Sequence, residues 1–523
     1  MNRSGVTTML RLQLRTGRVA LVAWVLGLLA TYVATVAAID ATYGTPEQLA
    51  TYGATVGADP TMAAINGTPY GADTLGGVVA NEFGFVAAIA VPLMGLMLVA
   101  RSTRREEEVG RLELVRSRAV GARAPWAAAL VVAGAALVLV GAGVTLTLVA
   151  HDVDLADAAL YGASLTGLGL VFAGVATLAG QLLRRSAGVL GAGIGVLGAA
   201  YVLRAVGDVE GNGWKWLSPL AWQQETRPFA DSRVWPLALA LGVAVALAGA
   251  GLALVGRRDL GSAVVASRPG PARASASGRG QLGMSVRLHG PSLAAWAVGA
   301  AGVGAVFGAF TDDVDDVIAS NPDLEVLLGG SGTDPTSWYV AYCLVLTLVM
   351  AMGAGAQVVG RARGEETAGR LEPLLARAVR RGRWLGAHAA SALLGAGLVA
   401  LAGGLGLALT ASGASGDAGG TMTATVTYLP AVLAVPALGL ALVGIAPRAT
   451  AALWAALAYV AVVEMLGETL RLPDWALDLS PLHAIGRLPT EAASGRAVAV
   501  VAGVVVLLLV IAVAGFRRRD VPR

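Results

Sequence analysis

Residues 127–150 read AAALVVAGAALVLVGAGVTLTLVA, a run of 24 residues without a charged side chain. About 20 mostly apolar residues suffice for a helix to cross a bilayer, so this run is long enough to span one. The 523-residue chain is 56% hydrophobic and 14% charged, with 70 Gly and one Cys, whereas soluble globular chains are about 25% charged. This composition predicts a membrane protein. It excludes a disordered chain, a disulfide scaffold and an ordinary soluble enzyme.

Twelve such runs occur along the chain, in two groups of six, and they predict an all-α polytopic fold. The first run is too long for the apolar part of a signal peptide, so we expect a retained helix. The first group is Val19–Ile39, Leu75–Ala100, Ala127–Ala150, Ala158–Leu183, Ala187–Leu203 and Leu237–Val255. The second group is Ser292–Phe310, Trp338–Val359, Leu385–Thr410, Thr427–Ile445, Ala449–Leu466 and Ala497–Phe516.

Arginine placement predicts the orientation, because basic residues stay on the cytoplasmic side of membrane helices. Residues 101–126 hold seven Arg, 257–290 hold six and 360–383 hold seven. Loop 40–74 holds four acids and no base, and loop 311–336 holds seven acids and no base. We therefore expect both termini in the cytoplasm and the protein in the inner (plasma) membrane.

The same sequence signals occur twice, about half a chain apart. Residues 104–113 (RREEEVGRLE) recur as residues 363–372 (RGEETAGRLE), an offset of 259, and Leu-Ser-Pro-Leu at 217–220 recurs at 479–482. Arg-Arg-Asp at 257–259 recurs at 518–520, while near the start Arg15 and Trp24 recur as Arg287 and Trp296 at an offset of 272. Because each half has an even number of spans, we expect parallel repeats over 1–260 and 284–523, joined by a flexible cytoplasmic linker over 261–283.

The duplicated loop after the second span of each half has the pattern of a short amphipathic helix. Glu107 and Arg111, like Glu366 and Arg370, are acid-before-base pairs at i,i+4, which favours a helix. An arginine-rich lipid anchor is one interpretation, but acids weaken such an anchor. A mixed-charge helix at equivalent places in two repeats favours a docking surface for a symmetric partner. Its candidate residues are Arg104, Glu106, Glu107, Gly110, Arg111, Leu112, Glu113, Arg363, Glu365, Glu366, Gly369, Arg370, Leu371 and Glu372.

With these motifs the chain resembles the ATP-binding-cassette exporter permeases associated with resistance to polyketide and ionophore antibiotics such as tetronasin. The resemblance covers essentially the whole chain and implies a permease of two six-helix halves that pairs with two copies of a separate ATPase. It implies that loops 101–126 and 360–383 contact those ATPases, which would bind ATP and Mg. The second loop departs from the first at Pro373, which tolerates a helix start or a kink, so the sequence leaves open whether the two docking sites are equivalent.

No enzyme site is expected within the chain. An ATPase phosphate loop requires Lys followed by Ser or Thr, but the only Lys here, Lys215, is followed by Trp216. The four His are isolated along the sequence, so no metal site is predicted and no catalytic residue is assigned.

Few ionisable residues lie inside the predicted spans, and such residues are functional candidates. Glu82 and Glu464 are the candidate pathway residues; each either pairs with a base across the bundle or faces a cavity that accepts cationic cargo. The prevalence of Ala, Val and Gly predicts a pathway for hydrophobic or amphipathic small molecules, and the resemblance implies that antibiotics and drugs are among them. The alternative function is a proton-coupled secondary multidrug transporter of the major-facilitator type.

Overall fold

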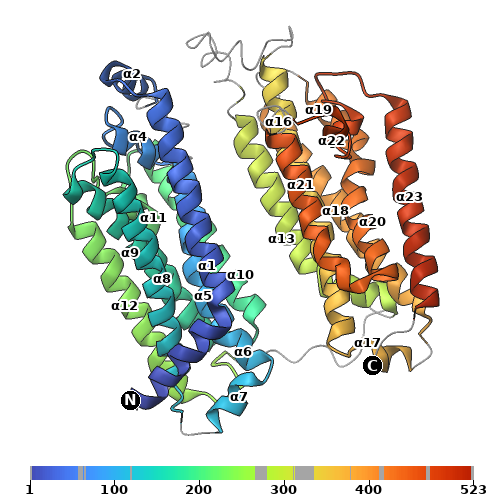
Figure 1. Cartoon of the computed structure of the whole chain (residues 1–523), viewed down its shortest axis with the longest axis horizontal. Coiled ribbons are helices and arrows are strands. Elements are labelled where there is room, and N and C mark those ends of the chain that lie inside the picture. Colours follow the sequence, from blue (N-terminus) through green and yellow to red (C-terminus); the bar gives the residue numbers. More distant parts are fainter. Residues whose placement is uncertain are drawn as a thin grey trace. The chain divides into compact units, whose positions relative to one another are not determined.

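The computed structural model describes residues 3–56, 63, 66–117, 120–265, 280–309, 311, 335–376, 379–411, 417–466 and 472–519. The described residues fall into two compact units, Met1–Gly270 (unit 1) and Pro271–Arg523 (unit 2), coloured blue to green and yellow to red in Figure 1. Most of the expected linker and most of the acidic loop 311–336 lie outside the described residues.

The described residues are helical, without a β-strand, which confirms the all-α prediction. Unit 1 contains α1 (Arg3–Thr42), α2 (Pro46–Val56), α4 (Leu75–Glu82), α5 (Gly84–Ser102), α6 (Arg104–Glu108), α7 (Arg111–Arg116), α8 (Ala124–Val149), α9 (Leu155–Leu182), α10 (Ser186–Val209), α11 (Pro219–Gln224) and α12 (Trp235–Leu254). Unit 2 contains α13 (Gln281–Ala309), α16 (Pro335–Thr367), α17 (Leu371–Leu375), α18 (Arg381–Ala411), α19 (Ala418–Thr427), α20 (Leu429–Ile445), α21 (Ala452–Leu466), α22 (Asp474–Leu477) and α23 (Gly495–Arg518).

Twelve helical segments within the described ranges are long and apolar enough to cross a membrane, six in each unit, as predicted. The second of them begins at Gly84, because the helix breaks at Phe83, between α4 and α5. Glu82, expected within that span, therefore lies just before it.

The interior of unit 1 forms around α9, which packs against α5, α8 and α12. The α9 side chains Leu165, Leu168 and Phe172 are fully buried. By contrast, few residues of the spans in α1 and α12 are buried, as expected for helices whose outer faces contact lipid.

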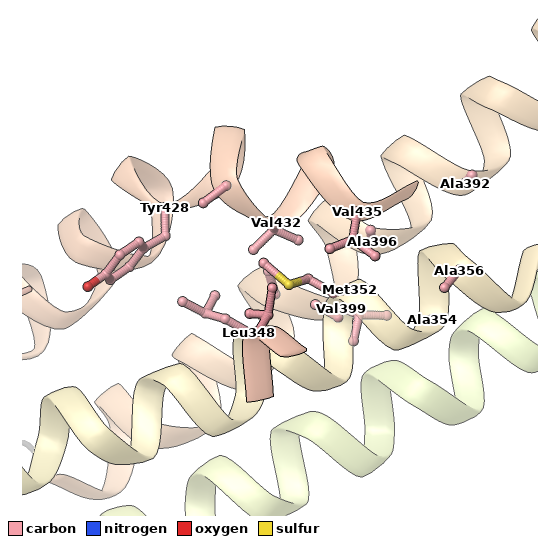
Figure 2. Packing of buried hydrophobic residues seen from close by; sticks show 14 of the residues in the cluster. Leu348, Met352, Ala354, Ala356, Ala392, Ala396, Val399, Tyr428, Val432 and Val435 are labelled. Atoms are coloured by element: carbon pink, nitrogen blue, oxygen red, sulfur yellow. The ribbon is translucent and has the colours of Figure 1, made fainter. Parts of the chain in front are cut away.

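Unit 2 is organised around α16, which packs against α13, α18 and α20. Figure 2 shows Leu348 and Met352 of α16 beside Val399 of α18 and Val432 and Val435 of α20. Its last helix, α23, packs mainly on α20.

Close approaches between helices depend on particular glycines. A Cβ at Gly95 of α5 would collide with the carbonyl oxygen of Gly169 of α9, and one at Gly304 of α13 would collide with that of Gly403 of α18. Small residues at such crossings let two backbones come into contact within a membrane. The glycines are therefore required where helices meet.

The arginine-rich loops lie at one end of each unit. Figure 1 shows α6 and α7 at the same end of unit 1 as the start of α1, and α17 at the same end of unit 2 as the end of α23. In unit 2 the repeated loop and the last helix of the repeat thereby lie at the same end.

Candidate functional site

In each repeated loop a glycine in the left-handed conformation lies between two helical segments, which are α6 and α7 in unit 1 and the end of the long helix α16 and the short helix α17 in unit 2. Gly110 has a φ of 77° and Gly369 a φ of 67°, values that disfavour any residue with a side chain. The expected i,i+4 pairs are therefore wrong, because the turn separates Glu107 from Arg111 and Glu366 from Arg370. Arg111 instead pairs with Glu106, with 2.8 Å between Nη2 and Oε1.

Glu107 anchors the loop of unit 1 to the exit of the last span. Its carboxylate receives hydrogen bonds from Arg258 Nη2 at 2.8 Å and from the backbone nitrogen of Gly261 at 2.8 Å. Arg104 Nη1 lies 2.8 Å from the same carboxylate, and its side chain also donates to the carbonyl oxygens of Arg184 and Ser262. The Glu107 side chain is only 2% exposed. These contacts form a buried tether between residues 104–107 and residues 258–262.

Glu366 makes the equivalent tether in unit 2. Arg363 Nη1 lies 2.8 Å from Glu366 Oε2, and Arg519 Nη1 lies 2.7 Å from Oε1. The glutamate side chain is 1% exposed. The two sequence repeats, the charged loop and the Arg-Arg-Asp exit, thus contact each other within each unit through one glutamate and two arginines.

The candidate docking residues separate into a buried and an exposed set. Arg104, Glu107, Leu112, Glu366 and Leu371 are buried. The partly or fully exposed candidates are Glu106, Gly110, Arg111, Glu113, Arg363, Glu365, Gly369, Arg370 and Glu372. Only this second set offers a surface to another protein.

Two apolar side chains that the sequence analysis did not select stand on the surface of the first loop. Leu114 is 75% exposed and Val109 is 54% exposed. Their counterparts at the offset of 259 are Pro373 and Ala368, so the second loop presents less apolar surface. The signal was present in the sequence, since both are apolar residues on the polar face of a charged loop.

A histidine pair adjoins the second loop. His289 Nε2 lies 3.1 Å from His388 Nδ1, and His388 Nε2 lies 3.4 Å from Glu365 Oε2. These His are isolated in sequence, yet the structure brings them together. They form a linear chain, and among the described residues no group of three or more His, Cys, Asp or Glu converges as a metal site requires.

The two candidate pathway glutamates have local partners. Glu82 accepts a hydrogen bond from the Tyr52 hydroxyl, which in turn accepts one from Asn81. Glu464 accepts hydrogen bonds from Ser480 Oγ and from the backbone nitrogen of His483. Because Ser480 belongs to the repeated Leu-Ser-Pro-Leu segment, Glu464 holds that segment against α21.

The first Leu-Ser-Pro-Leu segment leads into a buried ionic cluster in the segment between α10 and α12. Ser218 Oγ donates to the carbonyl oxygen of Ala200 at 2.7 Å. Beyond it, the carboxylate of Glu225 is 1% exposed and receives hydrogen bonds from Lys215, Arg227 and the Tyr70 hydroxyl. Burial alone would raise the pKa of the Glu225 carboxyl, but these hydrogen bonds hold the pKa below its usual range.

Comparisons with known proteins agree with this architecture. A family model described as "Multidrug efflux system permease Rv1217c, C-terminal domain" matches residues 6–255 and 279–517, one segment in each repeat. The chain is 33% identical over 531 residues to the Mycobacterium tuberculosis protein "Multidrug efflux system permease protein Rv1217c", a match covering 99% of this chain and 95% of that relative. The chain is therefore a multi-pass membrane protein that belongs to the family of multidrug efflux permeases.

Proposed function

We propose that this permease is the membrane subunit of an ATP-driven exporter of the ATP-binding-cassette type, in the group associated with polyketide and tetronasin resistance. Two copies of a separate ATPase, which bind ATP and Mg, dock on the two repeated loops at the cytoplasmic face of the plasma membrane. The permease moves hydrophobic or amphipathic small molecules out of the cell.

The observation that carries the proposal is the pair of tethers at Glu107 and Glu366. Each one fixes a loop with an exposed, mixed-charge surface to the end of the last span of its repeat. A docked ATPase that changes shape on binding ATP would therefore pull on a membrane helix rather than on a loose loop. This connection is what an external motor needs in order to drive a change of access.

The motor is assigned to a partner because the sequence cannot supply one. Lys215 is the only lysine, and the residue after it is neither Ser nor Thr. The exposed Leu114 and Val109 beside Arg111 and Glu113 supply the apolar centre and charged rim that protein interfaces combine.

The two docking sites are unequal in this proposal. The first loop presents Leu114 where the second presents Pro373, and Val109 where the second presents Ala368. We expect one ATPase copy to bind more tightly than the other.

The decisive experiment is co-expression of the permease with its proposed ATPase partner and co-purification of the two. Leu114→Asp should reduce the recovered ATPase by about tenfold, because a charge then replaces an apolar contact at the interface. Leu155→Asp is the matched control: Leu155 is 63% exposed but begins α9, at the opposite end of unit 1.

Energy coupling gives the second arm of the test. Export that persists after the proton gradient is dissipated, while ATP remains, supports the ATP-driven mechanism. Export that stops under those conditions, or an unchanged ATPase recovery with Leu114→Asp, would contradict it.

A further inference from the structure

A pocket of about 470 Å³ opens at the arginine-rich end of unit 1, between α1, α5, α6, α7 and α8. Its wall is apolar and includes Leu98 of α5 and Val132 of α8. Its rim is basic and consists of Arg101, Arg105 and Arg111. An apolar wall below a basic rim suits an amphipathic anion.

The rim has two positive charges in excess. Glu106, which also lines the pocket, pairs with Arg111. Among the described residues, no acid pairs with Arg101 or Arg105, and both side chains are exposed. A ligand with a phosphate group would neutralise this excess.

Gln13 adds a requirement for a hydrogen-bond donor. Its side chain is 6% exposed and lines the pocket, and its amide nitrogen donates to the carbonyl oxygen of Pro125 at 3.0 Å. Its Oε1 is buried and accepts no hydrogen bond in the part of the chain that the structure describes. A buried acceptor without a donor is costly, so a hydroxyl on the ligand would stabilise the site.

Unit 2 differs at several of the matching positions, although Arg370 matches Arg111. At the offset of 259, Gly360 and Gly364 stand in place of Arg101 and Arg105. At the offset of 272, His289 stands in place of Gly17, and its ring contacts His388. The two unpaired arginines, Arg101 and Arg105, therefore have no arginine counterparts at the matching positions of unit 2.

We propose that this pocket binds one anionic phospholipid whose headgroup carries hydroxyls, of which phosphatidylglycerol is the simplest. The phosphate would contact Arg101 and Arg105, a headgroup hydroxyl would donate to Gln13, and an acyl chain would lie along Leu98 and Val132. Arg101 is in the last turn of α5, a span end that the positive-inside rule places at the inner headgroup level. The inference rests on the cytoplasmic orientation of the proposed function but not on ATPase docking.

The test is lipid retention by the full-length permease without its ATPase. The protein is reconstituted in phosphatidylcholine nanodiscs that contain some phosphatidylglycerol, released, and examined by native mass spectrometry. Wild type should retain one phosphatidylglycerol in preference to phosphatidylcholine. Arg101→Gln with Arg105→Gln should weaken that retention by roughly tenfold to thirtyfold, since each arginine near an anionic headgroup contributes on the order of a factor of five.

Two further variants make the test specific. Gly17→Leu should reduce retention comparably by filling the pocket, because a Cβ there meets only the Leu21 side chain, at an ordinary 3.8 Å. Arg380→Gln with Arg383→Gln, which removes two exposed arginines from the second repeat, should leave retention unchanged.

Each contrary result has a definite meaning. Equal retention by wild type and the Arg101/Arg105 variant, or no preference for phosphatidylglycerol, would overturn the lipid site. Displacement of the lipid by an equal concentration of inorganic phosphate would assign the pocket to a free anion instead. Unchanged lipid retention together with lost ATPase binding in the Arg101/Arg105 variant would assign it to a protein partner.

Discussion

Adjacent glutamates in the repeated loop have opposite environments. Glu107 is buried between Arg104 and Arg258, whereas Glu106 pairs with Arg111 at the surface. A buried charge that loses its partner is strongly destabilising, while exposed ion pairs contribute little. Glu107 therefore has a structural role, whereas Glu106, one residue before it, belongs to the surface.

Glu107→Gln should lower the free energy of unfolding by about 3 to 5 kcal/mol, because two buried guanidinium groups lose their counter-charge. Glu106→Gln should lower it by about 1 kcal/mol or less. Denaturant titration of both purified variants in mixed micelles measures the difference. Equal effects would show that Glu107 is not the anchor of the loop.

Glu225 makes the stability of unit 1 depend on pH. The folded protein holds the pKa of Glu225 below the pKa of the same carboxyl in the unfolded chain, which is about 4.3. The ionised Glu225 therefore stabilises the folded protein fully at pH values above the unfolded-state pKa. This stabilisation is lost as the pH falls through the pKa of the folded state. The melting temperature should therefore fall with acidification below about pH 4. Glu225→Gln should melt at a lower temperature near neutral pH and show a weaker pH dependence.

The exposed neighbour Asp231 provides the control for that measurement. It pairs with Arg233 but its side chain is 71% exposed. Asp231→Asn should leave the melting curve close to that of wild type. A wild-type acid transition unchanged by Glu225→Gln would place the responsible carboxylate elsewhere.

At the scale of the helices, a glycine matters for packing only where two helices touch. Gly304 and Gly406 lie where α13 and α18 touch, so a Cβ at either position would collide with a backbone carbonyl of the other helix. Gly191 and Gly195 of α10 have the same spacing as Gly304 and Gly308, yet a Cβ on either would meet open space. The small-residue spacing alone does not reveal which pairs form contacts.

Gly304→Val should destabilise unit 2 by about 1 to 3 kcal/mol, because α13 must move away from α18. Gly191→Val should change stability by no more than about 0.5 kcal/mol. Thermal unfolding of the two variants, each with an unchanged gel-filtration profile, checks the contrast. A comparable loss for both would mean that the contact between α13 and α18 does not set the cost.

At the scale of the whole molecule, the tethers predict how coupling can be broken without losing the partner. Arg258→Gln with Arg519→Gln removes from each tether the arginine that follows the last helix of the repeat, and so weakens both tethers, but it leaves the exposed docking surface intact. Drug export should fall by roughly threefold to thirtyfold while the ATPase still co-purifies. Efflux assays in cells and pull-down of the ATPase measure the two quantities.

The arginines directly before Arg258 and Arg519 provide the matched control for this double variant. Arg257 and Arg518 are exposed, so Arg257→Gln with Arg518→Gln removes the same charge without touching either tether. Export should then remain near the wild-type level. A similar loss in both double variants would point to overall charge rather than to the tethers.

Long apolar runs in the sequence were sufficient to find the twelve candidate spans of the described residues, because the bilayer demands long apolar helices wherever the chain crosses it. The sequence pattern also located the repeated loop but misjudged the loop's internal pairs. Glu107 and Arg111 share a helix face only if the helix is continuous, and the left-handed Gly110 interrupts it. The break at Phe83, which removes Glu82 from the second span, was also hidden, since the apolar run continues through it.

The sequence by itself determined the class of the protein: a duplicated all-helical membrane chain with charged loops at matching positions. These features depend on composition and on the spacing of residues along the chain. The bilayer imposes both on each span separately, whatever the rest of the chain does. Only the tertiary structure decided that Glu107 meets Arg258 and Glu366 meets Arg519, pairs separated by about 150 residues. A buried charge is stable only beside its counter-charge, and which residue supplies that partner depends on how the helices pack together.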